Sequence, residues 1–193
     1  MGARVGNADG RVKDARRRMT GALVPVPASA ATWHEFVAIW PPRAHTGAIM
    51  ATTAVIVEML GGTRALRAKP TTPRHLRERV REGLPYASLD AVARRLQLDD
   101  EEIATLVGLP PRTLARRKAA RRLRAEESDR LYRVSRIAAL AEETLGSADK
   151  AARWLRAPNR ALGHEAPLGC LDTDPGVRQV EDVLLRIAHG VHS

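Results

Sequence analysis

The sequence predicts an all-α protein built from several short helices. Apolar residues recur at intervals of three and four through most of the chain after residue 47, as they do on one face of a helix. No alternation of polar and apolar residues is long enough to build a sheet. Glycine and proline residues divide the helical pattern into separate segments.

The first 47 residues lack this pattern. They mix Gly, Ala, Arg and Pro, and such a segment buries too little apolar surface to offset the entropy of ordering it. We therefore expect residues 1–47 to form a flexible extension. One exception is expected at residues 33–40, where Trp33 and Trp40 belong to a short helical pattern.

Residues 48–124 are expected to be helical and basic. A helix is predicted from Ala48 to Leu60 and is ended by a Gly-Gly pair, and another covers Arg74 to Glu82. Gly83 closes that segment. Ser88 is the expected N-cap of the next helix, because a short hydroxyl side chain can accept a hydrogen bond from the first free backbone N–H groups.

The spacing of three residues after this helix predicts a helix-turn-helix motif. If Asp100 is its first position, Ala104 is the fifth, Gly108 the ninth and Leu114 the fifteenth. The motif needs a small residue for close helix approach, a glycine in the turn and an apolar anchor at these places. The recognition helix is then expected to begin at Pro111.

Positive charge is concentrated in the same part of the chain. The formal net charge is +10, and residues 1–124 hold 23 basic and 11 acidic side chains against 9 and 11 in residues 125–193. A basic balance indicates nucleic acid or a membrane surface as partner, and no apolar run is long enough to span a membrane. Few acids neutralise the basic run, so we expect DNA contacts from Arg112, Thr113, Arg116, Arg117, Lys118, Arg121 and Arg122.

The near-neutral remainder, residues 125–193, predicts a linking helix and a small helical domain. A long helix is expected over Glu126 to Leu145, followed by Gly146 and a new helix that begins at Ser147. The last helix begins near Pro175 with an apolar stripe of period 3.5. Such a stripe forms either a partner-facing seam or, more often, part of the core.

Motifs for catalysis are absent from the sequence. It has no phosphate-binding loop, no dinucleotide-binding glycine motif, no HExxH zinc motif and no GxSxG nucleophile motif. We therefore expect no catalytic residues, no cofactor, no metal and no enzymatic activity. The single cysteine, Cys170, closes no intrachain disulfide, which fits a cytoplasmic protein.

A detailed pattern covers Ala151 to Val191. It comprises a tryptophan helix, a Pro-Asn loop, a Leu-Gly pair, a proline and a closing helix that ends in glycine, carried by Trp154, Leu155, Pro158, Asn159, Leu162, Gly163, Pro167, Leu171, Gly176, Val180 and Gly190. This stretch resembles the toxin-binding domain of the Xre/MbcA/ParS antitoxin family. The segments Leu109–Lys118 and Glu126–Ala138 resemble the DNA-binding part of the same proteins.

The resemblance implies an antitoxin of a type II toxin-antitoxin system. The usual partner in this family is a RES-domain toxin that depletes NAD, while the helix-turn-helix binds operator DNA in the operon's own promoter. The terminal helix would then block the toxin sterically. A homodimer is expected because operators commonly match the two-fold symmetry of the protein. The implied toxin contacts are Trp154, Asn159, Leu162, Gly190 and Val191, with a core position as the alternative for Trp154.

Two departures from the family pattern leave alternatives open. Arg121 and Ala125 stand where Gly and Pro are common, which predicts a longer or differently bent helix. Arg117 occupies the eighteenth motif position, where helix-turn-helix units usually carry an apolar residue. The alternatives are a toxin neutraliser that does not read DNA sequence, and a stand-alone helix-turn-helix regulator.

Overall fold

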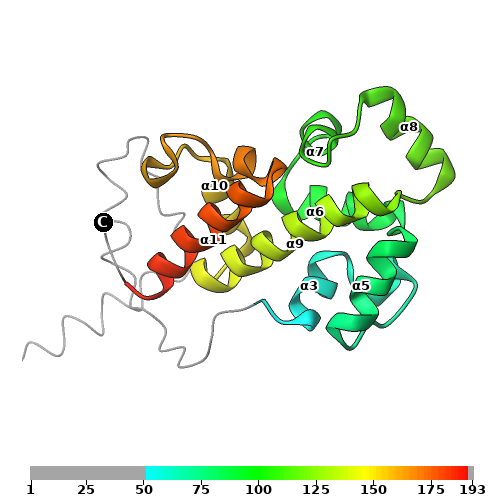
Figure 1. Ribbon diagram of the computed structural model, residues 1–193, viewed down its shortest axis with the longest axis horizontal. Coiled ribbons are helices and arrows are strands. Elements are labelled where there is room, and N and C mark those ends of the chain that lie inside the picture. Colours follow the sequence, from blue (N-terminus) through cyan, green and yellow to red (C-terminus); the bar gives the residue numbers. More distant parts are fainter. Residues whose placement is uncertain (1–50, 191–193) are drawn as a thin grey trace, which may run out of the picture. The chain divides into compact units, whose positions relative to one another are not determined.

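The computed structural model describes residues 51–190, and all regular elements in this range are helices (Figure 1). This confirms the predicted all-α class. The expectations for residues 1–47, including the helix at 33–40, lie outside the described residues. In chain order the elements are α3 Thr53–Met59, α4 Gly62–Leu66, α5 Pro73–Glu82, α6 Tyr86–Leu96, α7 Asp100–Leu106, α8 Pro111–Ala120, α9 Ala125–Leu145, α10 Ala148–Arg156, η2 Arg160–Leu162, η3 Pro167–Asp172 and α11 Asp174–Ala188.

The Gly-Gly pair ends one helix and begins another. Helix α3 stops at Met59, and Gly61 then adopts a φ of +90°, which a residue without a side chain reaches without strain. Helix α4 starts directly at Gly62 and was not predicted. Two consecutive glycines usually mark the end of a helix. Here the chain turns at Gly61 and a new helix begins at the next residue.

Helix α5 follows the prediction and α6 does not. Thr72 accepts a hydrogen bond from the His75 backbone N–H at 3.2 Å and so caps α5. Helix α6 begins at Tyr86, so the expectation that Ser88 is its N-cap is wrong, and Ser88 lies fully buried inside the first turn. The helix starts early because the Tyr86 N–H, free of an intrahelical partner, donates to the Arg121 carbonyl at 3.1 Å.

Helix α9 lies at the centre of the described chain. Its side chains Leu131, Val134 and Ile137 are fully buried. It packs against α3 and α5, which precede it in sequence, and against α10 and α11, which follow it (Figure 1). Although α9 has 21 residues, no helix in residues 51–190 is both long and apolar enough to cross a bilayer.

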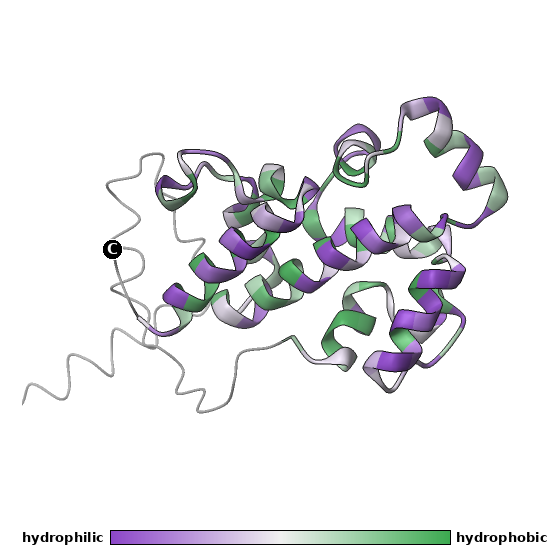
Figure 2. Cartoon of the chain, viewed as in Figure 1, coloured by the Kyte–Doolittle hydropathy of each residue, from purple (hydrophilic) through white to green (hydrophobic). Residues whose placement is uncertain are grey.

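The ends of the later helices agree with the sequence. Gly146 ends α9 with a φ of +77°, and the Ser147 hydroxyl accepts from the Lys150 N–H at 3.2 Å to start α10. Helix α11 carries both hydrophobic and hydrophilic residues (Figure 2), and its stripe members Val180 and Leu184 are fully buried where α11 packs on α9. The stripe is therefore part of the core.

Two connections pair with each other beside α9. The Leu123 N–H donates to the Leu84 carbonyl at 2.9 Å, and the Leu84 N–H donates to the Ser128 hydroxyl at 2.7 Å. Gly83 makes this approach possible: its φ is +96°, and a Cβ there would lie 2.2 Å from the Leu123 carbonyl oxygen. The loop after α5 thereby fixes the loop that follows α8.

Substituting Gly83→Ala is predicted to lower the free energy of unfolding by about 2 kcal/mol or more, because the φ disfavours a side chain and the new methyl group meets backbone. Urea unfolding followed by circular dichroism measures the change. Gly169→Ala is the matched control, since a Cβ at Gly169 has no neighbour within 4 Å. Equal stability of the two variants would contradict the prediction.

Candidate functional site

Helices α7 and α8 form the predicted helix-turn-helix. Asp99 caps α7 together with Glu102 in a reciprocal capping box. Ala104 is 2% exposed and Leu114 is 8% exposed, while Gly108 occupies the turn with a φ of +67°. The small residue, the turn glycine and the apolar anchor thus lie where the spacing placed them.

The outer face of α8 carries cations that face solvent. Arg112 and Arg116 are exposed and lie one helical turn apart, and Lys118 and Arg121 are exposed further along. Thr113 is half-buried. Within residues 51–190, none of these four basic side chains forms an ion pair or a side-chain hydrogen bond. Their donors are therefore available to an anionic partner.

Arg117 lies on the opposite, buried side of α8. Its Nε donates to both carboxylate oxygens of Glu127 on α9, at 2.9 and 2.8 Å, and Arg117 is only 7% exposed. This placement contradicts the expectation that Arg117 contacts DNA. The charge suggested an exposed side chain, but the position is the buried eighteenth place of the motif, and the side chain instead joins α8 to α9.

The pair changes the pKa of both groups. Burial alone would raise the pKa of Glu127, but the hydrogen bonds from the Arg117 guanidinium and from the Arg124 backbone N–H outweigh it and hold this pKa below its usual range. The hydrogen bond to Glu127 raises the pKa of Arg117, against the effect of burial. Both groups are therefore charged at neutral pH.

Arg121 and Arg122 differ in their surroundings. Arg121 ends α8 with a φ of +54°, the conformation usually left to glycine, so the expected longer helix is wrong. Arg122 is exposed, but its Nε donates to the Glu82 carbonyl at 3.2 Å and its Nη2 lies 3.9 Å from the Glu82 carboxylate. Arg122 thus connects the end of α8 to the end of α5.

The residues expected to contact a toxin lie after α9. Trp154 is 8% exposed within the core, which favours packing over partner contact. Asn159 is half-buried and organises its loop: its Oδ1 accepts from the Ala161 N–H at 2.9 Å. Leu162 is partly buried against the core. Gly190 is exposed, and Val191 lies outside the described residues.

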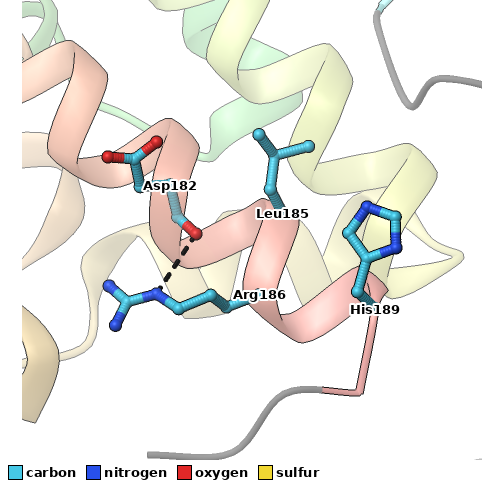
Figure 3. A pocket seen from close by; sticks show the side chains of 4 residues that line it. All are labelled: Asp182, Leu185, Arg186 and His189. Carbon is cyan, nitrogen blue, oxygen red and sulfur yellow. Dashed lines mark hydrogen bonds between the residues drawn. The ribbon is translucent and has the colours of Figure 1, made fainter.

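The outer face of α11 adds residues that sequence reasoning missed. A shallow depression is lined by Asp182, Leu185, Arg186 and His189 (Figure 3), directly before Gly190. Arg186 Nε donates to the Asp182 carbonyl at 3.4 Å. These positions are the complement of the buried stripe on α11, so the period of that stripe could have located them.

Both the helix-turn-helix segment and the C-terminal segment match known protein families. Residues 75–136 match the antitoxin Xre-like helix-turn-helix domain, and residues 140–190 match the antitoxin Xre/MbcA/ParS C-terminal toxin-binding domain. Antitoxin Xre of Photorhabdus laumondii is 33% identical over 121 residues, which cover 62% of this chain and 82% of that relative. The chain belongs to the Xre antitoxin family.

Two further antitoxins named Xre are similar to this chain. The protein of Yersinia enterocolitica is 32% identical over 116 residues, 59% of this chain and 78% of the relative. The protein of Pseudomonas putida is 43% identical over 83 residues, 42% of this chain and 52% of the relative. This chain thus has a helix-turn-helix domain followed by a C-terminal toxin-binding domain, as predicted. All three relatives are named as antitoxins rather than enzymes.

Helix α9 of the antitoxin extends across both matched segments, because it begins at Ala125 and ends at Leu145. The expected domain boundary at residue 124 remains a prediction. Polar contacts also join the segments: Arg95 on α6 binds Glu142 through two hydrogen bonds of 2.6 Å, and Arg156 on α10 binds Glu102 on α7 at 2.7 Å.

Substituting Arg117→Ala is predicted to lower the free energy of unfolding by about 3 kcal/mol, because it leaves the Glu127 carboxylate buried without its cation. Arg116→Ala is the control, since the neighbouring side chain is exposed and the expected change is within about 0.5 kcal/mol. Denaturant unfolding at pH 7 compares the two variants. A larger loss for Arg116→Ala would contradict the assignment of the buried pair.

The difference between the wild type and Arg117→Ala should depend on pH. The lowered pKa of Glu127 stabilises the folded wild type at neutral pH, and this contribution is lost as the pH falls through the folded-state value. In the variant, burial without Arg117 favours the protonated acid, so acidification relieves its penalty. The stability difference should therefore shrink as the pH falls through the usual carboxyl range, from the raised pKa of Glu127 in the variant to its lowered pKa in the wild type. A constant difference down to acid unfolding would exclude Glu127 as its source.

Proposed function

We propose that this antitoxin represses its own operon by binding promoter DNA through α8, and that its C-terminal domain blocks a cognate RES-type toxin. The observation that carries the DNA-binding part is the row of exposed cations on the recognition helix that have no ion-pair partner among residues 51–190. The matched toxin-binding domain at residues 140–190 supports the second part. The depletion of NAD would be chemistry of the toxin.

The geometry of α8 supports the DNA-binding half of the proposal. A recognition helix places its N-terminal residues against base edges in the major groove. Arg112 and Arg116 occupy this part of the exposed face, and an arginine can bind a guanine edge with two hydrogen bonds. Thr113, Lys118, Arg121 and Arg122 are proposed to contact phosphates or base edges. Arg117 instead fixes the orientation of α8 through Glu127.

Operator binding is proposed to involve a homodimer. Helix-turn-helix proteins commonly match their own two-fold symmetry to a palindromic operator. If the complex neutralises six to eight phosphates, log K should fall against log salt with a slope of roughly −5 to −7. We expect this strong salt dependence because positive charge is concentrated in residues 1–124.

The toxin-binding half is proposed to work sterically. Asn159 and Leu162 lie in the segment after α10, and Gly190 and Val191 follow α11 in the sequence. The depression on the outer face of α11 is lined in part by His189, which directly precedes Gly190. We propose that this terminal segment covers the substrate entrance of the toxin, while Trp154 holds α10 in place from the core.

Replacing Arg112 and Arg116 together by Ala is predicted to abolish preference for promoter DNA over random duplex, with a loss of about 1 to 3 kcal/mol for each base contact removed. Fluorescence polarisation with both duplexes measures the preference. Neutralisation of the toxin should persist, because the toxin-binding segment is unchanged. If the double variant keeps the wild-type preference, α8 does not read the promoter.

Truncation after Leu185 is predicted to have the opposite effect. It removes the end of α11 and the terminal residues while leaving the helix-turn-helix intact. Co-expression with the cognate toxin should show loss of protection from growth arrest, and polarisation should show promoter binding at wild-type affinity. The double variant at Arg112 and Arg116 is the matched control. Full protection by the truncated chain would contradict the steric mechanism.

A further inference from the structure

We propose that α5 and the loop before it form a second basic surface that contacts DNA phosphates beside the segment read by α8. The α5 basic surface consists of Arg67, Lys69, Arg77 and Arg81. This inference rests on the proposed DNA binding and adds to it a phosphate-binding element outside the recognition helix. Helix α5 consists mostly of hydrophilic residues (Figure 2).

The charge of this segment is not neutralised internally. Residues 64–82 contain seven arginines or lysines and two acids. The acids are already engaged: Arg74 pairs with Glu78 at 3.0 Å, and Arg79 pairs with Glu82 at 2.6 Å. The members of the α5 basic surface are exposed and, in the part of the chain that the structure describes, form no ion pair or side-chain hydrogen bond.

Helix α5 holds two of these cations in a fixed orientation. Leu76 and Val80 are buried, at 2% and 7% exposure, and α5 packs against α9. Arg77 and Arg81 each follow one of these anchors and lie one turn apart, so they share an exposed face of the helix. A rigid helix presents such side chains at a lower entropic cost than a mobile loop does.

The C-terminal end of α5 lies beside the C-terminal end of α8. Arg122, directly after the exposed Arg121, donates to the carbonyl of Glu82, the last residue of α5, at 3.2 Å. The paired connections between Leu84 and Leu123 hold the C-terminal ends of α5 and α8 together. Figure 1 shows α5 beside the start of α9, where the chain returns from α8. The C-terminal ends of the two helices therefore lie together, as contact of both with one duplex requires.

The composition of the surface favours phosphates over a protein partner. Protein interfaces usually have an apolar centre, but the one large hydrophobic residue exposed in residues 51–190 is Val55 on α3. Three of the four cations are arginines, which bind phosphate oxygens with a planar pair of donors. Contacts of this kind position a duplex without reading its sequence. The α5 basic surface should therefore strengthen binding to every duplex by the same factor.

The test is a salt titration of the full chain carrying Arg77→Ala and Arg81→Ala. The slope of log K against log salt should become less steep by about 2, since each lost phosphate contact removes about 0.9. Affinity near 0.1 M salt should fall roughly tenfold or more on promoter and random duplex alike. Replacing both residues by Lys should restore the wild-type slope, because a lysine still neutralises a phosphate.

The matched control removes two exposed arginines from the toxin-binding domain, Arg160→Ala with Arg186→Ala, and should keep the wild-type slope. A slope for the α5 variant equal to that of this control would overturn the inference, and so would a loss confined to promoter DNA. These results leave the proposed function standing if the wild type prefers its promoter. A wild type without that preference contradicts the proposed repression itself, whatever the α5 variant does.

Discussion

The burial of the middle of α9, on all of its sides, is the constraint on which the rest of the structure depends. Leu131, Val134 and Ile137 are removed from water by helices that come from both sides of α9 in the sequence. Burying one such side chain contributes about 1.5 to 3 kcal/mol. Ala138, Ala139 and Ala141 are also buried, and their small side chains allow the neighbouring helices to approach closely. The two matched domains therefore share one core.

The orientation of the recognition helix follows from this core through polar contacts. The buried pair between Arg117 and Glu127 joins α8 to α9, and the connection after α8 is held by backbone hydrogen bonds to Leu84 and Tyr86. In addition, Arg95 on α6 binds Glu142 on α9. Arg156 on α10 binds Glu102 on α7. The exposed cations of α8 are thus presented by a rigid scaffold, as a DNA-reading helix requires.

Features set by neighbouring residues could be predicted from the sequence, and features set by distant pairing could not. Ala104, Gly108 and Leu114 obey a spacing rule within one motif, so the helix-turn-helix was found without a structure. Arg117 was placed wrongly because its partner lies on another helix. The N-cap predicted at Ser88 is wrong because the sequence does not show that the Tyr86 N–H pairs with the Arg121 carbonyl. At Trp154 the sequence left both a core position and a toxin contact open, and only its burial favours packing.

The net charge of the chain is an average over a basic part and a near-neutral part. We attribute the basic part to DNA and the near-neutral part to the toxin, and hydrogen-deuterium exchange of the full chain tests this division most directly. Promoter DNA should slow exchange in α5 and α8 and leave α11 unchanged, while the purified toxin should slow exchange in the loop after α10 and at the end of α11. Protection of the same helices by both partners would contradict the account.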